Sequence, residues 1–478
     1  MEIDKIVAVE KTRLDQFGSS IALDNGVVAA GAPLDEDNGF NSGSAYIFDA
    51  TNGVQVAKLL PNDGGLGDEF GSVLGMDSGL IAIGVPFDND NGSDSGSAYI
   101  FDASNGAELF KLLPSDGAVD DLFGSTIAID NDIVAVGSPS DNDNGHASGS
   151  AYIFDAQTGI QIVKLLPSDG SQLKQFGKSI AIDNGIVAIG DFSNDNGMNS
   201  GSVYLFDAVT GAQLFKLISE DGASNDNFGG AIAIDNGIVA IGTPWDDDNG
   251  TDSGSVYLFD VSTGVELAKL LPSDGAANDW LGFSIAIDNG VVAVGAYKDD
   301  DNGQDSGSVY LFDASTGLEL FKLLPEDGTA GDLFGWSIDM DNGVVAVGAL
   351  GGVDNDSDSA YLFDASTGEQ LFKLRLRDGV ANDLFGQSIA IENMSIAVGA
   401  NRDNYNGIDS GSVYLFDSTP AQVCIADFTG DGVYDFHDIS VFLSLFAGGD
   451  LGADLTGDGI LNFFDISAFL QAFAQGCP

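Results

Sequence analysis

The stretch that decides the fold is FGSTIAIDNDIVAVGSPSDNDNGHASGSAYIFDAQTGIQIVKL, residues 123–165. It contains four short apolar or alternating runs, separated by the turn residues Asn, Asp, Gly and Ser. The runs STIAID and IVAVGSP flank an Asn-Asp turn and predict a hairpin, and GSAYIFD and IQIVKL follow as two further strands. The stretch therefore predicts four consecutive antiparallel strands with almost no helical pattern.

Copies of this unit recur along the chain at a nearly constant step of 51 to 53 residues. The copies begin with a Phe-Gly pair, or Leu-Gly once, at Phe17, Phe70, Phe123, Phe176, Phe228, Leu281, Phe334 and Phe385. Four antiparallel strands per roughly 50 residues are the signature of a β-propeller blade. The sequence predicts an all-β propeller over residues 1–417 with eight four-stranded blades. Seven blades, with one unit outside the ring, is the alternative.

The two ends of this region complement each other. The last unit stops after GSVYLFD at Asp417 and lacks a fourth strand, whereas the chain begins with DKIVAVE before its first Phe-Gly pair. We expect this N-terminal segment to complete the last blade and to close the ring.

A lysine recurs in the fourth strand of the units. Lysine on an exposed edge strand blocks edge-to-edge pairing, so we expect this strand to be the outermost one of each blade and not a binding patch. The lysines are Lys58, Lys111, Lys164, Lys216, Lys269, Lys322 and Lys373.

An acidic loop precedes the third strand of most units, as in DNDNG at 88–92. It is interpreted first as an Asn-Gly turn that starts the next strand, and second as a weak calcium site. Ser193 and Tyr405 interrupt the acidic pair in two units. The candidate ligands are Asp35 and Asp37, Asp88 and Asp90, Asp141 and Asp143, Asp246 and Asp248, and Asp299 and Asp301.

A Phe-Gly pair followed by Gly31-Ala32-Pro33 resembles the FG-GAP repeat of integrin α-chain propellers and many bacterial surface proteins. The resemblance covers residues 1–417 and implies a propeller used for binding or adhesion. Integrin-type calcium loops lie between the Phe-Gly strand and the Gly-Ala-Pro strand, where this chain has only a short turn such as DNG. The calcium residues of that family therefore have no counterparts by position.

Residues 424–478 contain a separate duplication, DFTGDGVYDFHD at 427–438 and DLTGDGILNFFD at 454–465. Oxygen ligands fall at positions 1, 3, 5, 9 and 12 of each copy and Gly at position 6, which is the EF-hand order for Ca²⁺. Position 7 supplies a backbone carbonyl. The predicted ligands are Asp427, Thr429, Asp431, Val433, Asp435 and Asp438, then Asp454, Thr456, Asp458, Ile460, Asn462 and Asp465.

Each loop runs into an apolar stretch that predicts a short amphipathic helix, and two such helices can pair. The duplicated loop and helix resemble a dockerin, with residues 418–423 as the linker. This resemblance implies tethering to a cohesin-like protein or an envelope component. Cys424 and Cys477 are the only cysteines, and a disulfide between them is expected, with a reduced pair as the alternative.

The composition limits the partners. The formal net charge is −58, from 16 Lys and Arg against 74 Asp and Glu. This balance argues against nucleic acid and anionic membranes and favours cation binding or a saline habitat. The chain has no apolar run long enough to span a membrane, and no signal peptide is visible. The resemblances imply an extracellular or cell-surface protein.

The sequence offers little for catalysis, because it contains two histidines, His146 and His437, neither in a recognisable catalytic context. We expect a non-catalytic binding or adhesion propeller whose ligand is a protein or a polysaccharide. The alternatives are a dockerin-borne carbohydrate-active enzyme and a structural surface protein. Trp245, Trp280 and Trp336 depart from the repeat, and blade packing is the favoured interpretation over sugar stacking by Trp245.

Overall fold

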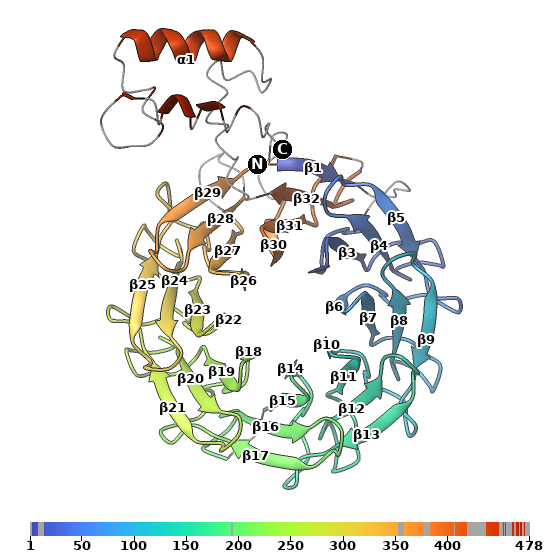
Figure 1. The fold of residues 1–478 in the computed structure, drawn as a ribbon. Coiled ribbons are helices and arrows are strands. Elements are labelled where there is room, and N and C mark those ends of the chain that lie inside the picture. Colours follow the sequence, from blue (N-terminus) through green and yellow to red (C-terminus); the bar gives the residue numbers. More distant parts are fainter. Residues whose placement is uncertain are drawn as a thin grey trace. The chain divides into compact units, whose positions relative to one another are not determined.

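A computed structural model describes residues 2–7, 14–192, 195–351, 358–376, 383–405, 407–417 and 436–448, together with single positions between 453 and 473. The chain divides into two compact units, Met1–Asp417 and Ser418–Pro478. The first unit is a ring of eight four-stranded antiparallel sheets (Figure 1). The predicted eight-bladed propeller is confirmed, and the alternative count of seven is wrong.

Blades 1 to 7 each contain four consecutive strands, which run in order from the central axis to the perimeter (Figure 1). Blades 1 to 4 are formed by β2 (Ile21–Asp24), β3 (Val27–Ala32), β4 (Ser44–Asp49) and β5 (Gln55–Leu59); β6 (Val73–Asp77), β7 (Leu80–Val85), β8 (Ser97–Asp102) and β9 (Glu108–Leu112); β10 (Thr126–Asp130), β11 (Ile133–Ser138), β12 (Ser150–Asp155) and β13 (Gln161–Leu165); and β14 (Ser179–Asp183), β15 (Ile186–Asp191), β16 (Ser202–Asp207) and β17 (Gln213–Leu217).

Blades 5 to 7 are formed by β18 (Ile232–Asp235), β19 (Ile238–Thr243), β20 (Ser255–Asp260) and β21 (Glu266–Leu270); β22 (Ser284–Asp288), β23 (Val291–Ala296), β24 (Ser308–Asp313) and β25 (Glu319–Leu323); and β26 (Ile338–Asp341), β27 (Val344–Ala349), β28 (Ser359–Asp364) and β29 (Gln370–Leu374). Blade 8 contains β30 (Phe385–Glu392), β31 (Ser395–Ala400), β32 (Ser412–Asp417) and β1 (Glu2–Ile6).

Blade 8 joins the two ends of the propeller sequence. β1 pairs antiparallel with β32, and Lys5 lies opposite Tyr414. Lys58 lies opposite Tyr46 in the same way in blade 1. The predicted closure of the ring by the N-terminal segment is therefore confirmed, and Lys5 is the eighth lysine of the repeat.

The hydrophobic core lies between neighbouring blades. In the third strand of each blade, alternate side chains face opposite neighbours, so Tyr152 and Phe154 pack toward blade 2 and Ile153 toward blade 4. The Phe123 ring meets the Tyr152 ring edge-on, with centroids 5.3 Å apart. A strand buried on both faces carries a continuous apolar run, which explains why Tyr, Ile and Phe follow each other without polar alternation.

The glycines of the two repeated motifs lock adjacent blades together. The N–H of Gly18 donates to the carbonyl of Gly31 in the same blade, at 2.8 Å. A Cβ on Gly31 would overlap the carbonyl oxygen of Gly71 in the next blade. The glycine of Gly-Ala-Pro is therefore retained in all eight units, whereas the alanine and proline vary.

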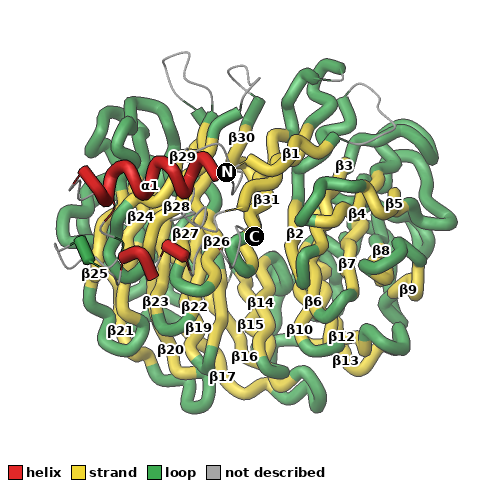
Figure 2. Tube along the Cα trace, turned by 45° about the horizontal axis from the view of Figure 1, so that its top comes forward, coloured by secondary structure: helices red, strands yellow, loops and turns green. Residues whose placement is uncertain are grey.

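Each blade presents two sets of loops, one at each end of its strands (Figure 2). The register pairs Thr126 with Gly137 and Ser138 with Ser150, so the first strand begins, the second ends and the third begins at the same edge. We call this edge, with the loops that precede Phe-Gly and follow Gly-Ala-Pro, the FG face. The acidic loops lie on the FG face.

The second unit contains α1 (Phe436–Gly448) and a further short helical stretch among the described positions 465–473. Phe442 and Phe469 each lie four residues after the last position of their loops, and their rings stack with centroids 4.1 Å apart. The two copies of the duplication thus share one small core. Among the described residues, no helix has the length and apolar character needed to cross a membrane.

Candidate ligand and metal sites

The acidic loops of the propeller surround the repeated lysine. In blade 2, the Nζ atom of Lys111 lies 2.9 Å from Asp88, 2.6 Å from Asp90 and 2.8 Å from Asp63. Asp88 and Asp90 belong to the loop of the same blade, whereas Asp63 comes from the loop between β5 and β6. Lys111 therefore joins its own acidic loop to the preceding blade, and Lys164, Lys216, Lys269 and Lys322 do the same. Lys58 pairs with its own loop, and Lys373 pairs with Asp327 of the preceding blade.

The same arrangement recurs around the ring. The further ion pairs join Lys58 to Asp35 and Asp37; Lys164 to Asp116, Asp141 and Asp143; Lys216 to Asp169 and Asp195; Lys269 to Asp221, Asp246 and Asp248; Lys322 to Asp274, Asp299 and Asp301; and Lys373 to Asp327.

The predicted reason for the lysine is wrong, although its predicted place on the outermost strand is confirmed. The Lys111 side chain is only 15% exposed and points back over the Tyr99 ring, 5.1 Å from its centroid. The side chain therefore does not extend into solvent to block edge-to-edge pairing. Its ammonium group instead forms ion pairs with three carboxylates. Burial by itself would lower the pKa of Lys111, but hydrogen bonds to Asp63 and Asp90 raise it above its usual value.

The first aspartate of the loop is also the hub of a hydrogen-bond network. One oxygen of Asp88 accepts the N–H of Asp90 at 3.0 Å, and the other accepts the hydroxyls of Ser97 at 2.7 Å and Tyr99 at 3.3 Å. These bonds hold the turn that starts β8. Calcium binding by these loops stays a prediction, and an ion there would have to displace the ammonium group.

The two interruptions of the acidic pair have different replacements. In blade 8, Tyr405 takes the place of the second acid, and the Nζ atom of Lys5 lies 4.2 Å from its ring centroid and 2.8 Å from Asp403. In blade 4, Ser193 lies outside the described residues. There Asp191 is buried and lies 3.9 Å from Lys174.

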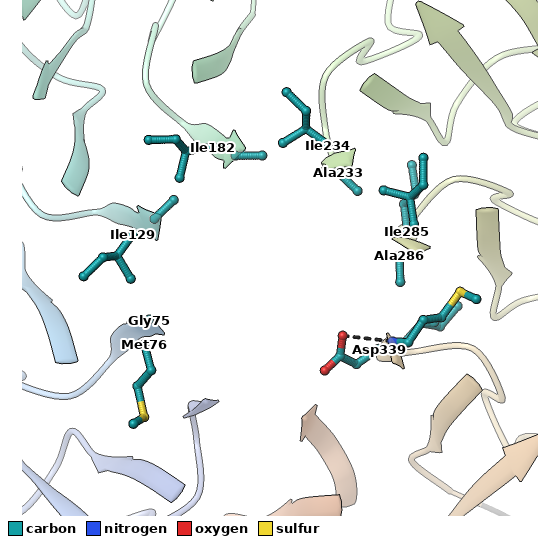
Figure 3. A pocket seen from close by; sticks show the side chains of 14 residues that line it. Gly75, Met76, Ile129, Ile182, Ala233, Ile234, Ile285, Ala286 and Asp339 are labelled. Atoms are coloured by element: carbon teal, nitrogen blue, oxygen red, sulfur yellow. Dashed lines mark hydrogen bonds between the residues drawn. The ribbon is translucent and has the colours of Figure 1, made fainter. Parts of the chain in front are cut away.

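A cavity of about 380 Å³ lies at the centre of the ring, where the first strands of blades 2 to 7 meet (Figure 3). Small and branched apolar side chains line it, among them Ile129 and Ile234, and Asp339 is the one titratable residue of the lining. Asp339 accepts the N–H of Ile391 at 2.8 Å and that of Met340 at 2.9 Å. Burial raises its pKa to about 6. The cavity lining therefore lacks the pair of carboxylates that glycoside hydrolysis requires.

The two predicted calcium loops are described only in part. Asp438 and Asp465, the last ligand of each loop, are completely buried. The N–H of Asn462 donates to Asp465 at 2.8 Å, so this carboxylate points back into its own loop. Buried carboxylates need a partner, and oxygen donors suit Ca²⁺, so these residues fit the ion. The remaining predicted ligands and both cysteines lie outside the described residues: Asp427, Thr429, Asp431, Val433, Asp435, Asp454, Thr456, Asp458, Ile460, Cys424 and Cys477.

The described residues offer no cluster of catalytic or metal-binding type. Within them, no group of three or more His, Cys, Asp or Glu side chains is arranged to hold a metal ion. His146 is exposed in the loop after β11, and its Nδ1 atom lies 3.3 Å from the amide oxygen of Asn142. This contact with an asparagine is not the Ser-His-Asp arrangement of a hydrolase.

The fold and the repeated glycines define the class of protein, an eight-bladed propeller. A family model described as "FG-GAP repeat" matches residues 1–48, 54–101, 107–154, 160–206, 212–259, 265–312, 319–363 and 369–416. The chain belongs to this family. Each matched segment begins with the outer strand of one blade and continues into the next blade.

One solved structure adds to this picture. The crystal structure of the computationally designed Ika8 protein matches with a TM-score of 0.56 and 16% identity, over 86% of this chain and 99% of the designed chain. At this identity the likeness concerns the fold alone. No curated protein matches the chain.

Proposed function

We propose that the protein is a non-catalytic binding or adhesion protein of the cell exterior. The observation that supports this proposal is the FG-GAP ring itself, in which the recurring acids are used to hold blades and loops together. The loops that depart from the repeat are then the parts that recognise a ligand, since a rigid scaffold with variable loops suits recognition.

The second unit is proposed to tether the propeller to a cohesin-like protein or an envelope component through two calcium loops of dockerin type. The buried carboxylates of Asp438 and Asp465 support this proposal, together with the stacked pair Phe442 and Phe469. Bound Ca²⁺ would supply the positive charge that these carboxylates require. The carboxylates of the two loops would hold the ions, and the two helical stretches pack together through their shared hydrophobic core.

An envelope-binding assay tests the tether. The full chain is incubated with envelopes of the source organism in calcium and, separately, in a calcium chelator. We expect retention in calcium and release by the chelator, and the Asp438→Asn, Asp465→Asn double variant should not be retained. Calcium-independent retention would contradict the proposed tether.

An assay for product release tests the absence of catalysis. The full chain is incubated with polysaccharides, and both bound protein and released sugars are measured. Binding without product supports the proposal. Turnover that is lost on changing one acid outside the repeat pattern would overturn it in favour of a carbohydrate-active enzyme.

A further inference from the structure

Five aromatic residues that depart from the repeat adjoin one another in blades 5 to 7. Trp245 follows β19 in blade 5, Trp280 and Phe283 precede β22 and Tyr297 follows β23 in blade 6, and Trp336 precedes β26 in blade 7. All five positions lie on the FG face. We call this set of five residues the aromatic arc. It contains all three tryptophans of the chain.

The rings of the aromatic arc form a continuous chain of contacts. The centroid distances are 6.2 Å from Trp245 to Trp280, 5.7 Å from Trp280 to Tyr297, 4.5 Å from Tyr297 to Phe283 and 5.3 Å from Phe283 to Trp336. The contacts between the first four rings are edge-on. The arc therefore spans three consecutive blades without interruption.

Blade packing alone does not account for the arc. The core between blades is built from the repeated Phe, Tyr and aliphatic residues, and it is complete in blades that have no counterpart of the arc. The position of Phe283 and Trp336 is serine in the first three units, and that of Trp245 is Leu34 in the first. Tyr297 is buried, whereas the other four rings are half-buried and keep part of their surface in solvent. The predicted packing of the tryptophans between blades is confirmed, because the contacts of Trp245 with Trp280 and of Trp336 with Phe283 join neighbouring blades. The ring surface that stays in solvent is not needed for this packing.

The charges around the arc select the kind of ligand. The net charge of −58 repels an acidic ligand. A cationic ligand would compete with Lys298, whose Nζ atom already lies 4.1 Å from the centroid of Trp280. A neutral ligand meets neither obstacle.

The neighbouring polar groups suit a sugar. Asp247 and Asp300 follow the arc residues in the acidic loops of blades 5 and 6, and both are exposed. A pyranose ring presents C–H groups on its faces, which stack on aromatic rings, and hydroxyl groups at its edge. Carboxylates accept hydrogen bonds from those hydroxyls, and the indole N–H and the lysine ammonium donate to them.

The geometry points to the aromatic arc as a binding site for a neutral polysaccharide chain. A row of rings across three blades matches an extended chain better than a single sugar. This inference rests on the proposed binding function and names its ligand class and its site.

Tryptophan emission and affinity electrophoresis of the full chain test the inference. The probes are glucomannan, xyloglucan and soluble starch as neutral polymers, alginate as an anionic one and chitosan as a cationic one. We expect at least one neutral polymer to retard the protein and to shift its emission, because every tryptophan lies in the arc. Alginate should do neither. Chitosan is expected to retard so acidic a protein by charge alone, so its informative readout is the tryptophan emission, which it should leave unshifted.

A variant built from the residues of other units keeps the test independent of folding. Trp245→Leu, Phe283→Ser and Trp336→Ser introduce residues that the first blade already carries at these positions. The triple variant should keep the wild-type melting temperature within a few degrees and bind at least about tenfold more weakly, as expected when central aromatic contacts are lost. Phe87→Leu, at the position of Trp245 in blade 2, is the matched control and should bind like the wild type.

The outcomes separate the site from the general function. Equal binding by the wild type and the triple variant would overturn the arc as the site but leave the binding function intact. A shift of the tryptophan emission by chitosan or alginate, with none by the neutral polymers, would overturn the ligand class. If none of the neutral polymers binds, the inference fails, and the proposed function then depends on the envelope assay alone.

Discussion

Two kinds of acidic loop occur in this chain, and they differ in the basic residues that their own part of the sequence supplies. The propeller loops whose acids the structure describes lie beside a lysine of the same polypeptide, as Asp88 and Asp90 lie beside Lys111. The second unit has no basic Lys or Arg of its own, because residues 418–478 contain eight aspartates and neither lysine nor arginine. We therefore propose that its carboxylates take a cation from solution.

This difference predicts which part of the protein responds to calcium. A lysine is a tethered cation that is always present, so the blade contacts it supports do not depend on metal. A calcium ion exchanges with solution, and its binding is coupled to the folding of the segment that holds it. We expect a metal-independent propeller and a metal-dependent second unit.

The largest expected effect is on calcium binding. Calorimetric titration of the full chain should show two calcium sites, one for each twelve-residue loop. The variant Asp438→Asn, Asp465→Asn should weaken both by about 100-fold or more, because the twelfth position supplies the bidentate ligand of such loops. The matched propeller variant Asp88→Asn, Asp141→Asn should leave both sites unchanged. Loss of sites in the propeller variant would contradict the comparison.

The next effect tests whether the lysine takes the place of a metal ion. Lys111→Met removes the ammonium group and leaves Asp63, Asp88 and Asp90 together without a counter-charge. We expect the free energy of unfolding to fall by about 2 kcal/mol, less than for a fully buried pair because two of the acids are partly exposed. Denaturant unfolding with and without calcium measures this change.

The same variant sharpens the comparison further. Calcium should restore part of the lost stability in Lys111→Met but should not stabilise the propeller of the wild type. Arg375→Met is the control, because the Arg375 side chain is 51% exposed where it pairs with Asp327. Such surface pairs contribute about 0–1 kcal/mol. An equal loss of unfolding free energy in both variants would show that Lys111 contributes no more to stability than the exposed Arg375.

The smallest expected effect concerns pH and compares acids with and without a lysine. Hydrogen bonds to Lys216 and Tyr204 outweigh burial and lower the pKa of Asp169 to about 2. Burial raises the pKa of Asp121, which accepts the N–H of Ala118 at 2.7 Å, to about 6. A raised carboxyl pKa gives stability that is complete below the unfolded value of about 3.9 and is lost as the pH rises through 6.

The melting temperature should therefore rise when the pH is lowered from 7 to 5, while Asp169 stays ionised. Asp121→Asn should reduce the accompanying gain in the free energy of unfolding by about 1 kcal/mol and so give a smaller rise in melting temperature, because the asparagine does not titrate. Asp169→Asn should lower stability by the same amount at both pH values. Melting curves of the wild type, Asp121→Asn and Asp169→Asn at pH 7 and pH 5 test both expectations. An identical rise in Asp121→Asn and the wild type would contradict the assignment.

The sequence predicted the propeller because its period is expressed in every strand. Phe-Gly, the Tyr-Ile-Phe run and the turn glycines recur at one spacing, and each is required by local backbone geometry or by burial on both faces of a strand. The N-terminal strand was also predictable, since one outer strand is missing at one end of the repeat and present at the other. These features depend on residues that are close together in the chain or on simple counting.

The role of the lysines was not predictable in the same way. Lys111 is 48 residues from Asp63, and only the packing of one blade on the next brings the two side chains together. The same is true of Trp245 and Trp336, which lie two blades apart in the sequence and at the two ends of one aromatic arc. The sequence shows that each tryptophan replaces the usual residue of its repeat position. It does not show that the three tryptophans lie close together in the fold.

The sequence by itself determined the repeat period, the order of strands in a blade and the place of the duplicated twelve-residue acidic loops, because periodicity and residue spacing are local properties. The tertiary structure alone decided which acids carry their own cation and which aromatic rings meet, because those contacts join different blades. The closing of a ring places residues from separate repeats side by side, and the chemistry of this protein depends on those contacts.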